Sequence, residues 1–147
     1  MVHTSYSSRN FRSGFTLIEL ILTMSIVLII GSISGVFYSR FINQNAVSNI
    51  SDQITEQMHK AQMYAMMGKN NSSWGVKLVG TSLTLFSSSS SAFDETFPVD
   101  PPVLVTGLTT VTFAKATGLP DSAPTINISG GGNDKVLVIN SQGVINR

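Results

Sequence analysis

An uncharged apolar segment near the start of the chain constrains the fold more than any other feature. Residues 20–39 contain no charged side chain, and the apolar run from Phe15 to Phe37 is 23 residues long. As a helix it would extend roughly 35 Å, which exceeds the bilayer's hydrocarbon core of about 30 Å. The apolar core of a cleaved secretory signal is usually only about 7 to 15 residues long. The sequence therefore predicts a retained transmembrane helix over residues 15–39.

The charges around this segment predict its orientation. The 14 residues before it contain Arg9 and Arg12 and no acidic residue. Because basic residues stay on the cytoplasmic side of a membrane, the N-terminus is expected in the cytoplasm and the chain after about Arg40 outside. The sequence therefore predicts a single-pass protein of the inner (cytoplasmic) membrane, in contact with membrane lipid, whose C-terminal domain is external.

Glu19 is the one charged residue inside the apolar run. An acidic side chain within a transmembrane helix costs about 2.5 to 3.5 kcal/mol on insertion scales and usually marks a functional site. Glu19 also lies close to the start of the helix, where the helix dipole favours an anion and the carboxylate can extend to the interface. On physical grounds alone, both interpretations stay open.

The residues around Glu19 resemble a known processing site. The run Gly14-Phe15-Thr16-Leu17-Ile18-Glu19-Leu20 resembles that of type IV pilins and the pseudopilins of type II secretion. The resemblance implies that a prepilin peptidase cleaves after Gly14, which removes the basic leader, residues 1–14, and that the new N-terminal Phe15 is N-methylated. Glycine suits such a site because it has no Cβ and can lie extended in a protease cleft.

The same resemblance gives Glu19 a role in assembly. It implies that the carboxylate of Glu19 pairs with the α-amino group of Phe15 on a neighbouring subunit, which compensates a buried charge. Glu19 would then fix the register of other pilin-like subunits in a filament and would not act as a catalyst.

Two glycines within the apolar segment allow two interpretations. Gly31 and Gly35 are four residues apart, and small residues at this spacing let transmembrane helices pack closely. Each glycine also weakens a helix by about 1 kcal/mol relative to alanine, so the same positions could be a point where the helix loosens. Both interpretations stay open.

An amphipathic helix is predicted to continue beyond the membrane, over residues 40–67. Apolar residues recur there at spacings of three and four, with polar residues between them. These apolar positions are Val47, Ile50, Ile54, Met58, Ala61 and Ala65. Gly68 and the polar residues 70–73 form a stop signal. We expect this second half of the helix to dock on a domain through one apolar stripe.

The remaining residues, 68–147, are predicted to form a β-rich globular head. Alternating apolar residues from Trp74 to Leu78 and again over residues 83–86, with a turn between them, indicate a hairpin. The serine-rich and proline-rich stretch from Ser87 to Pro102 is expected to be an exposed loop. Further strands are expected over residues 103–106, 110–114, 125–129, 135–140 and 144–146. The predicted fold is α+β, with a long N-terminal helix packed on a small, mostly antiparallel sheet.

The order of these elements narrows the resemblance to the H-type minor pseudopilins. The segments that carry it are Trp74-Gly75-Val76, Val111-Thr112-Phe113 and residues 138–143. It implies a structural subunit of a type II secretion pseudopilus, assembled into a helical filament by machinery of the inner membrane. One alternative is a minor pilin of a type IV pilus, active in adhesion or DNA uptake. The alternative from another class is a signal-anchored exported domain that binds a ligand or acts as an enzyme.

Little in the sequence indicates catalytic or metal chemistry. The chain has no cysteine and two separate histidines, His3 and His59, so we expect no metal site and no cofactor. The loop aspartates Asp100, Asp121 and Asp134 do not form a recognisable calcium loop. The glycines 130–132 are expected to form a tight turn, because the ending of a phosphate-binding loop is missing.

Nucleic acid is not an expected partner of the mature chain. Without Arg9 and Arg12, seven basic residues remain against eight acidic ones, a side-chain charge of about −1. A chain with this balance has no electrostatic basis for binding a polyanion. We expect a non-enzymatic protein with no catalytic residue.

Overall fold

The computed structural model describes residues 14–147, apart from the side chains of Ile33, Ser34 and Val36. The leader predicted for residues 1–14 therefore lies outside the described residues except for its last glycine, and His3 lies outside them as well. The chain divides into two compact units, of which the first ends at Phe37 and the second runs from Tyr38 to Arg147.

Helix α1 (Leu17–Met66) is the longest element and contributes to both units. Its end agrees with the predicted stop signal. Gly68 adopts a left-handed conformation with φ of 62°, which glycine reaches without the steric cost of a Cβ atom. The short 3-10 helix η1 (Lys69–Asn71) follows, with Gly68 as its N-cap. The prediction of a helix that runs from the apolar segment into the head is confirmed.

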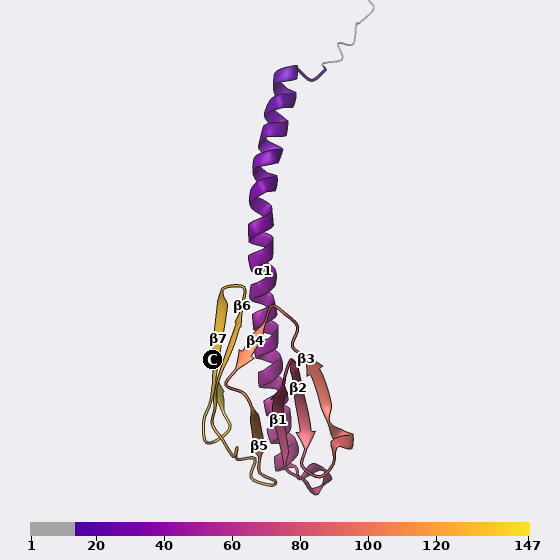
Figure 1. Ribbon diagram of the computed structural model, residues 1–147, viewed down its shortest axis with the longest axis vertical. Helices are drawn as coiled ribbons and strands as arrows, with labels where there is room; N and C mark the ends of the chain where they lie inside the picture. The colour runs from indigo at the N-terminus through magenta and orange to yellow at the C-terminus, as the bar shows by residue number, and fades with distance from the viewer. Residues whose placement is uncertain (1–13) are drawn as a thin grey trace, which may run out of the picture. The chain divides into compact units, whose positions relative to one another are not determined.

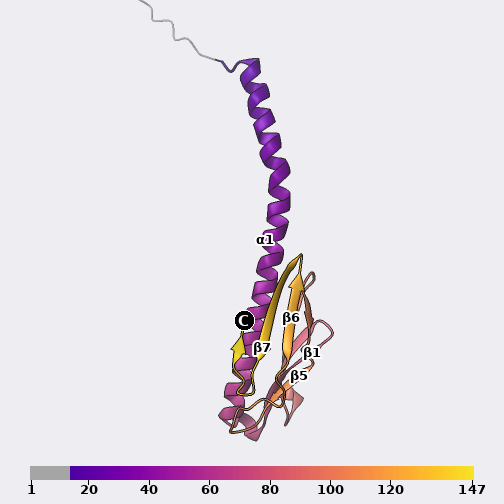
Figure 2. The ribbon, with the colours of Figure 1, turned by 90° about the vertical axis from the view of Figure 1, so that its left-hand side faces the viewer.

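The second unit contains eight strands, which form two antiparallel sheets of four strands each within the described residues. The first sheet has the order β3-β2-β1-β5 and consists of β1 (Trp74–Val79), β2 (Ser82–Ser87), β3 (Glu95–Pro98) and β5 (Thr110–Phe113). The second has the order β4-β6-β7-β8 and consists of β4 (Leu104–Thr106), β6 (Thr125–Gly130), β7 (Asn133–Ile139) and β8 (Ile145–Asn146). Both sheets cover the C-terminal half of α1 (Figures 1 and 2).

The apolar stripe of α1 is the centre of the core. Val47, Ile54, Met58, Ala61 and Ala65 are each at most 1% exposed, and Ile50 packs against them from a partly buried position. This confirms the predicted stripe. The core residues from the sheets include members of both sheets: Trp74, Val76, Leu83, Leu85, Val111 and Phe113 from the first, and Val105, Ile126, Ile128, Leu137 and Ile139 from the second.

The buried face of α1 is wider than the predicted stripe. Ser51 and Gln57 are polar residues that lie between stripe residues in the sequence. They are nevertheless buried, with exposures of 0% and 4%. The reason is geometric: a single sheet covers one arc of a helix, whereas two sheets side by side cover a broader arc. The Ser51 Oγ and Gln57 Oε1 atoms are buried without a hydrogen-bond partner in the described part of the chain, and such atoms carry a desolvation cost.

The two predicted turns are confirmed. Strands β1 and β2 pair from Trp74↔Ser87 to Val79↔Ser82, which leaves Gly80 and Thr81 as a two-residue turn. Strands β6 and β7 pair up to Gly130↔Asn133, so the turn between them is Gly131-Gly132, with φ of 57° and 81°. Two consecutive positive φ angles are what the tight hairpin turn demands and glycine readily supplies.

The expectation of an exposed loop from Ser87 to Pro102 is wrong. The stretch contains the 3-10 helix η2 (Ser91–Phe93) and the edge strand β3, which pairs with β2 from Ser82↔Pro98 to Leu85↔Glu95. Phe97 packs against the core from this strand. This apolar contact holds the segment on the head, although its many serines and prolines are typical of a loop. Pro98 is tolerated because proline fits an edge strand, where one row of N–H groups is unpaired.

An ion pair joins α1 to strand β3. The Lys60 ammonium donates to Glu95 Oε2 at 2.6 Å, with side-chain exposures of 27% and 44%. This hydrogen bond raises the pKa of Lys60 above its ordinary value of 10.5, and partial burial opposes the rise. Since the folded-state pKa is raised, the stabilisation is present at neutral pH and is lost as the pH rises through that pKa.

We expect the Glu95→Gln variant to lose this alkaline dependence. The pair is partly exposed, so removing it should lower the free energy of unfolding at pH 7 by about 0.5 kcal/mol. Above roughly pH 10.5, the unfolded-state pKa of lysine, the natural chain should lose stability faster than the variant. Calorimetric melting of both proteins in the same detergent from pH 7 to 11 measures this; parallel curves would contradict it.

Candidate processing and assembly site

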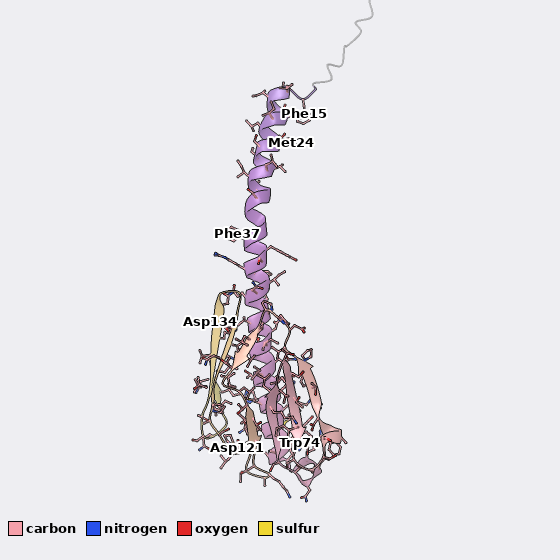
Figure 3. All side chains as sticks on the ribbon, in the orientation of Figure 1. Phe15, Met24, Phe37, Trp74, Asp121 and Asp134 are labelled. Carbon is pink, nitrogen blue, oxygen red and sulfur yellow. The ribbon has the colours of Figure 1, made fainter. Side chains whose placement is uncertain are left out.

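The predicted cleavage position is accessible. Gly14 and Phe15 precede α1, and Phe15 is 80% exposed (Figure 3). Thr16 then starts the helix, because its Oγ1 accepts a hydrogen bond from the backbone N–H of Glu19 at 3.3 Å. This satisfies one of the amide groups that the first turn of a helix leaves without a partner. The bond predicted to be cleaved therefore lies outside regular secondary structure, just before a capped helix.

Thr16 is a functional residue that the sequence analysis missed. Threonine followed three residues later by glutamate has the spacing of a capping box, in which each residue's side chain bonds the other's N–H. The structure contains the bond from the Glu19 N–H to Thr16 Oγ1. The signal was present in the sequence, since Thr16 and Glu19 stand at the correct interval before an apolar run.

Glu19 lies exposed in the first turn of α1, and its carboxylate forms no ion pair with any of residues 14–147. The helix dipole favours a negative charge at this position. The predicted pairing with the α-amino group of Phe15 on a neighbouring subunit stays a prediction. The Glu19 side chain is exposed, so a second molecule could reach it.

The first unit exposes its apolar side chains all around α1. Large apolar residues between Phe15 and Phe37 are 47–80% exposed where their side chains are described, and they project outward in Figure 3. In the described part of the chain, α1 is the single helix long and apolar enough to cross a membrane. A helix that is apolar all round is typical of a membrane span, and α1 is compatible with a membrane anchor.

Three hydroxyl groups of this segment are satisfied within the helix. Thr23 Oγ1 donates to the carbonyl of Leu20 at 2.9 Å, and Ser25 Oγ donates to that of Ile21 at 2.8 Å. Ser32 Oγ makes the same kind of bond, at 2.9 Å. Such bonds back to the preceding turn remove the need for water, so these polar residues do not oppose insertion into lipid.

Gly31 and Gly35 lie in helical backbone, and a Cβ atom added at either would meet no atom within 4 Å. The small surface that they form is therefore open for a second helix to approach. Their role in helix packing stays a prediction.

The head offers little converging chemistry. No group of three or more histidine, aspartate or glutamate residues within the described residues could hold a metal ion. His59 is exposed on α1. Asp121 Oδ1 accepts hydrogen bonds from the Thr112 N–H and the Ser122 hydroxyl, and Asp134 lies well away from it in Figure 3. The loop aspartates that sequence analysis considered for calcium are thus not brought together.

The fold and the site are compatible with a membrane-anchored protein. An apolar helix with a processing motif at its start continues into a head of two antiparallel sheets. Comparison with known families agrees, since the model of the prokaryotic N-terminal methylation motif matches residues 9–35. The match supports a type IV pilin-like family, and it implies processing by prepilin peptidase and assembly with other pilin subunits. The head lies outside the matched residues. No curated protein and no solved structure matches the chain.

Proposed function

We propose that the chain is a minor pseudopilin, a non-enzymatic structural subunit of a type II secretion pseudopilus. The subunit would be inserted in the inner membrane with its N-terminus in the cytoplasm. Cleavage of the peptide bond after Gly14 would remove its leader. Inner-membrane machinery would then draw it into a helical filament with bundled N-terminal helices at its core. The methylation motif over residues 9–35 is the observation that carries the proposal.

Two features of α1 support assembly through this helix. The exposed apolar surface from Leu17 to Phe37 can be covered first by lipid and then by the helices of other subunits. Glu19 has no ion-pair partner among residues 14–147, and cleavage after Gly14 would create a new ammonium group at Phe15. A charge without a partner among the described residues is well suited to select the register of a neighbouring subunit.

The order of elements in the head favours the H-type pseudopilins over other pilin-like subunits. Strand β1 begins at Trp74 after α1 and the short helix η1, β5 ends at Phe113, and β7 ends at Ile139 next to the edge strand β8. These are the segments on which the sequence resemblance depends. The subfamily, and with it the secretion role, is the finer part of the proposal.

Deleting the subunit should separate secretion from the alternative role in a type IV pilus. We expect loss of type II secretion while piliation and DNA transformation continue at the level of the parent strain, because a pseudopilus lacking one subunit cannot complete its assembly. The three functions are measured side by side, and secretion is restored by the natural gene supplied in trans. Normal secretion with lost DNA uptake would instead identify a minor pilin.

Neutralising Glu19 should distinguish an assembling subunit from an ordinary anchored domain. We expect the Glu19→Gln variant to insert into the membrane but to lose co-purification with the other filament subunits, because it cannot attract the Phe15 ammonium. Glu56→Gln is the matched control, since Glu56 is an exposed acid on the same helix in the second unit. Equal co-purification of all three proteins would favour the anchored domain.

A further inference from the structure

A polar cavity lies where α1 enters the second unit. It encloses about 390 Å³ and is lined by Arg40 and Gln44 of α1 and by Gly131, Gly132 and Asn133 of the β6–β7 hairpin. The turn of this hairpin lies beside α1 in both views (Figures 1 and 2). The cavity therefore joins two segments that are about ninety residues apart in the chain.

Glycine allows the turn to come this close to the helix. A Cβ atom at Gly131 would lie 2.2 Å from Asn43 Nδ2, and one at Gly130 would lie 3.1 Å from a methyl carbon of Val47. Arg40, Asn43 and Gln44 are three and four residues apart, so they share one face of α1. The same face that packs against the turn thus directs Arg40 and Gln44 to the cavity.

The charged side chain and the unpaired backbone N–H groups around the cavity are hydrogen-bond donors. Arg40 forms no ion pair with any of residues 14–147, and the Gly131 and Gly132 N–H groups form no hydrogen bond within that part of the chain. None of the described residues that line the cavity is acidic. A guanidinium beside free amide N–H groups is a favourable arrangement for phosphate oxygens.

The nearest acidic and basic side chains in β7 do not occupy this position. Asp134 is exposed, pairs across the sheet with Ser129 and is not among the lining residues. Lys135 points toward α1 and donates to Ser48 Oγ at 3.0 Å. Arg40 is therefore the charged group that defines the electrostatics of the cavity.

The position of Arg40 in the sequence indicates the source of the phosphate. It is the first charged residue after the uncharged segment 20–39. When that segment spans a bilayer, as the proposed function requires, Arg40 lies at the depth of the lipid headgroups. We propose that the cavity binds the phosphate of an anionic membrane lipid. A zwitterionic headgroup fits less well, because no lining carboxylate would pair with its ammonium group.

The test uses the full chain, labelled with ¹⁵N-glycine, in phosphatidylcholine nanodiscs to which phosphatidylglycerol is added. We expect the amide signals of Gly131 and Gly132 to shift and saturate. Arg40→Gln should weaken the apparent affinity about tenfold, because it removes a charge-assisted hydrogen bond. Lys115→Gln is the matched control: it removes one exposed positive charge near β5, outside the cavity, and should leave the affinity unchanged.

Three results would overturn the proposal. The glycine signals could fail to respond to phosphatidylglycerol, or Lys115→Gln could weaken binding as much as Arg40→Gln. Inorganic phosphate in phosphatidylcholine nanodiscs could produce the same saturating shift at lower concentration, which would identify free phosphate as the ligand. A chain that does not enter nanodiscs would contradict the membrane anchor itself, and this is seen before any lipid is added.

Discussion

The Gly14→Val variant is expected to accumulate as the uncleaved precursor, whereas the natural chain should begin at N-methylated Phe15. Gly14 is exposed and a Cβ atom there would meet nothing within 4 Å, so the substitution leaves the rest of the chain undisturbed. A branched side chain would obstruct the extended backbone that a protease cleft must accept. Intact mass spectrometry of the protein from cells that contain the prepilin peptidase measures the ratio of the two forms.

Gly31→Val is the matched control for this substitution. Gly31 is also exposed with open space around it, so the same change is made in the same unit but away from the predicted cleavage position. This variant should be processed as completely as the natural chain. An intact Met1 in the natural protein, or a cut after Ser34 or Ser39, would contradict processing at Gly14. Efficient cleavage of Gly14→Val would show that the glycine is incidental.

Loss of cleavage should also prevent assembly. In the precursor, the nitrogen of Phe15 is part of a peptide bond and carries no positive charge, so Glu19 has no ammonium group to attract. The Gly14→Val and Glu19→Gln variants should therefore fail at the same stage for opposite reasons, one lacking the cation and the other the anion. Because they disrupt one interaction, combining them should add little to either single effect.

Local periodicity made the helix and its buried face predictable from the sequence. The stripe from Val47 to Ala65 follows from a spacing of three and four residues, which any helix places on one side. Gly68 and the two-residue turn at Gly80-Thr81 are equally local signals, since they depend on which residues tolerate positive φ angles. The structure confirms each of them.

Pairing between distant strands could not be predicted in the same way. Strand β1 pairs with β5 through Trp74↔Phe113, and no local pattern states which strand a given segment joins. The division into two sheets, and with it the burial of Gln57, depends on these long-range choices. Strand β3 escaped prediction because its composition is that of a loop, while its neighbour β2 supplies the pairing.

The candidate sites differ in the same way: one depends on residues adjacent in the sequence, and the other on residues far apart in it. Gly14, Phe15 and Glu19 are neighbours in sequence, so a linear motif contains all the information needed to find them. The cavity beside Arg40 has no linear motif, because its other wall comes from the turn at Gly131-Gly132. Only the folded chain brings these two segments together.

Replacing Trp74 with alanine is expected to destabilise the head by about 3 to 5 kcal/mol, the usual cost of emptying a large aromatic site in a core. Trp74 is 1% exposed, its ring meets that of Tyr64 edge-on at 4.9 Å between centroids, and its Nε1–H donates to the Lys69 carbonyl at 3.0 Å. Hydrogen exchange followed by mass spectrometry should show the slowest amides of β1 and β5 exchanging about a hundredfold to a few thousandfold faster.

The Trp74→Phe variant separates the ring from its hydrogen bond. Phenylalanine keeps most of the aromatic contact with Tyr64 but cannot donate to Lys69, so its cost should be smaller, about 1 to 2 kcal/mol. Peptides from the described part of the first unit, residues 14–37, serve as an internal reference, because none of these residues belongs to the core around Trp74. If both variants lost the same free energy of unfolding, the hydrogen bond of Trp74 would account for its effect on stability. Because the ring is buried, we expect the alanine variant to lose more.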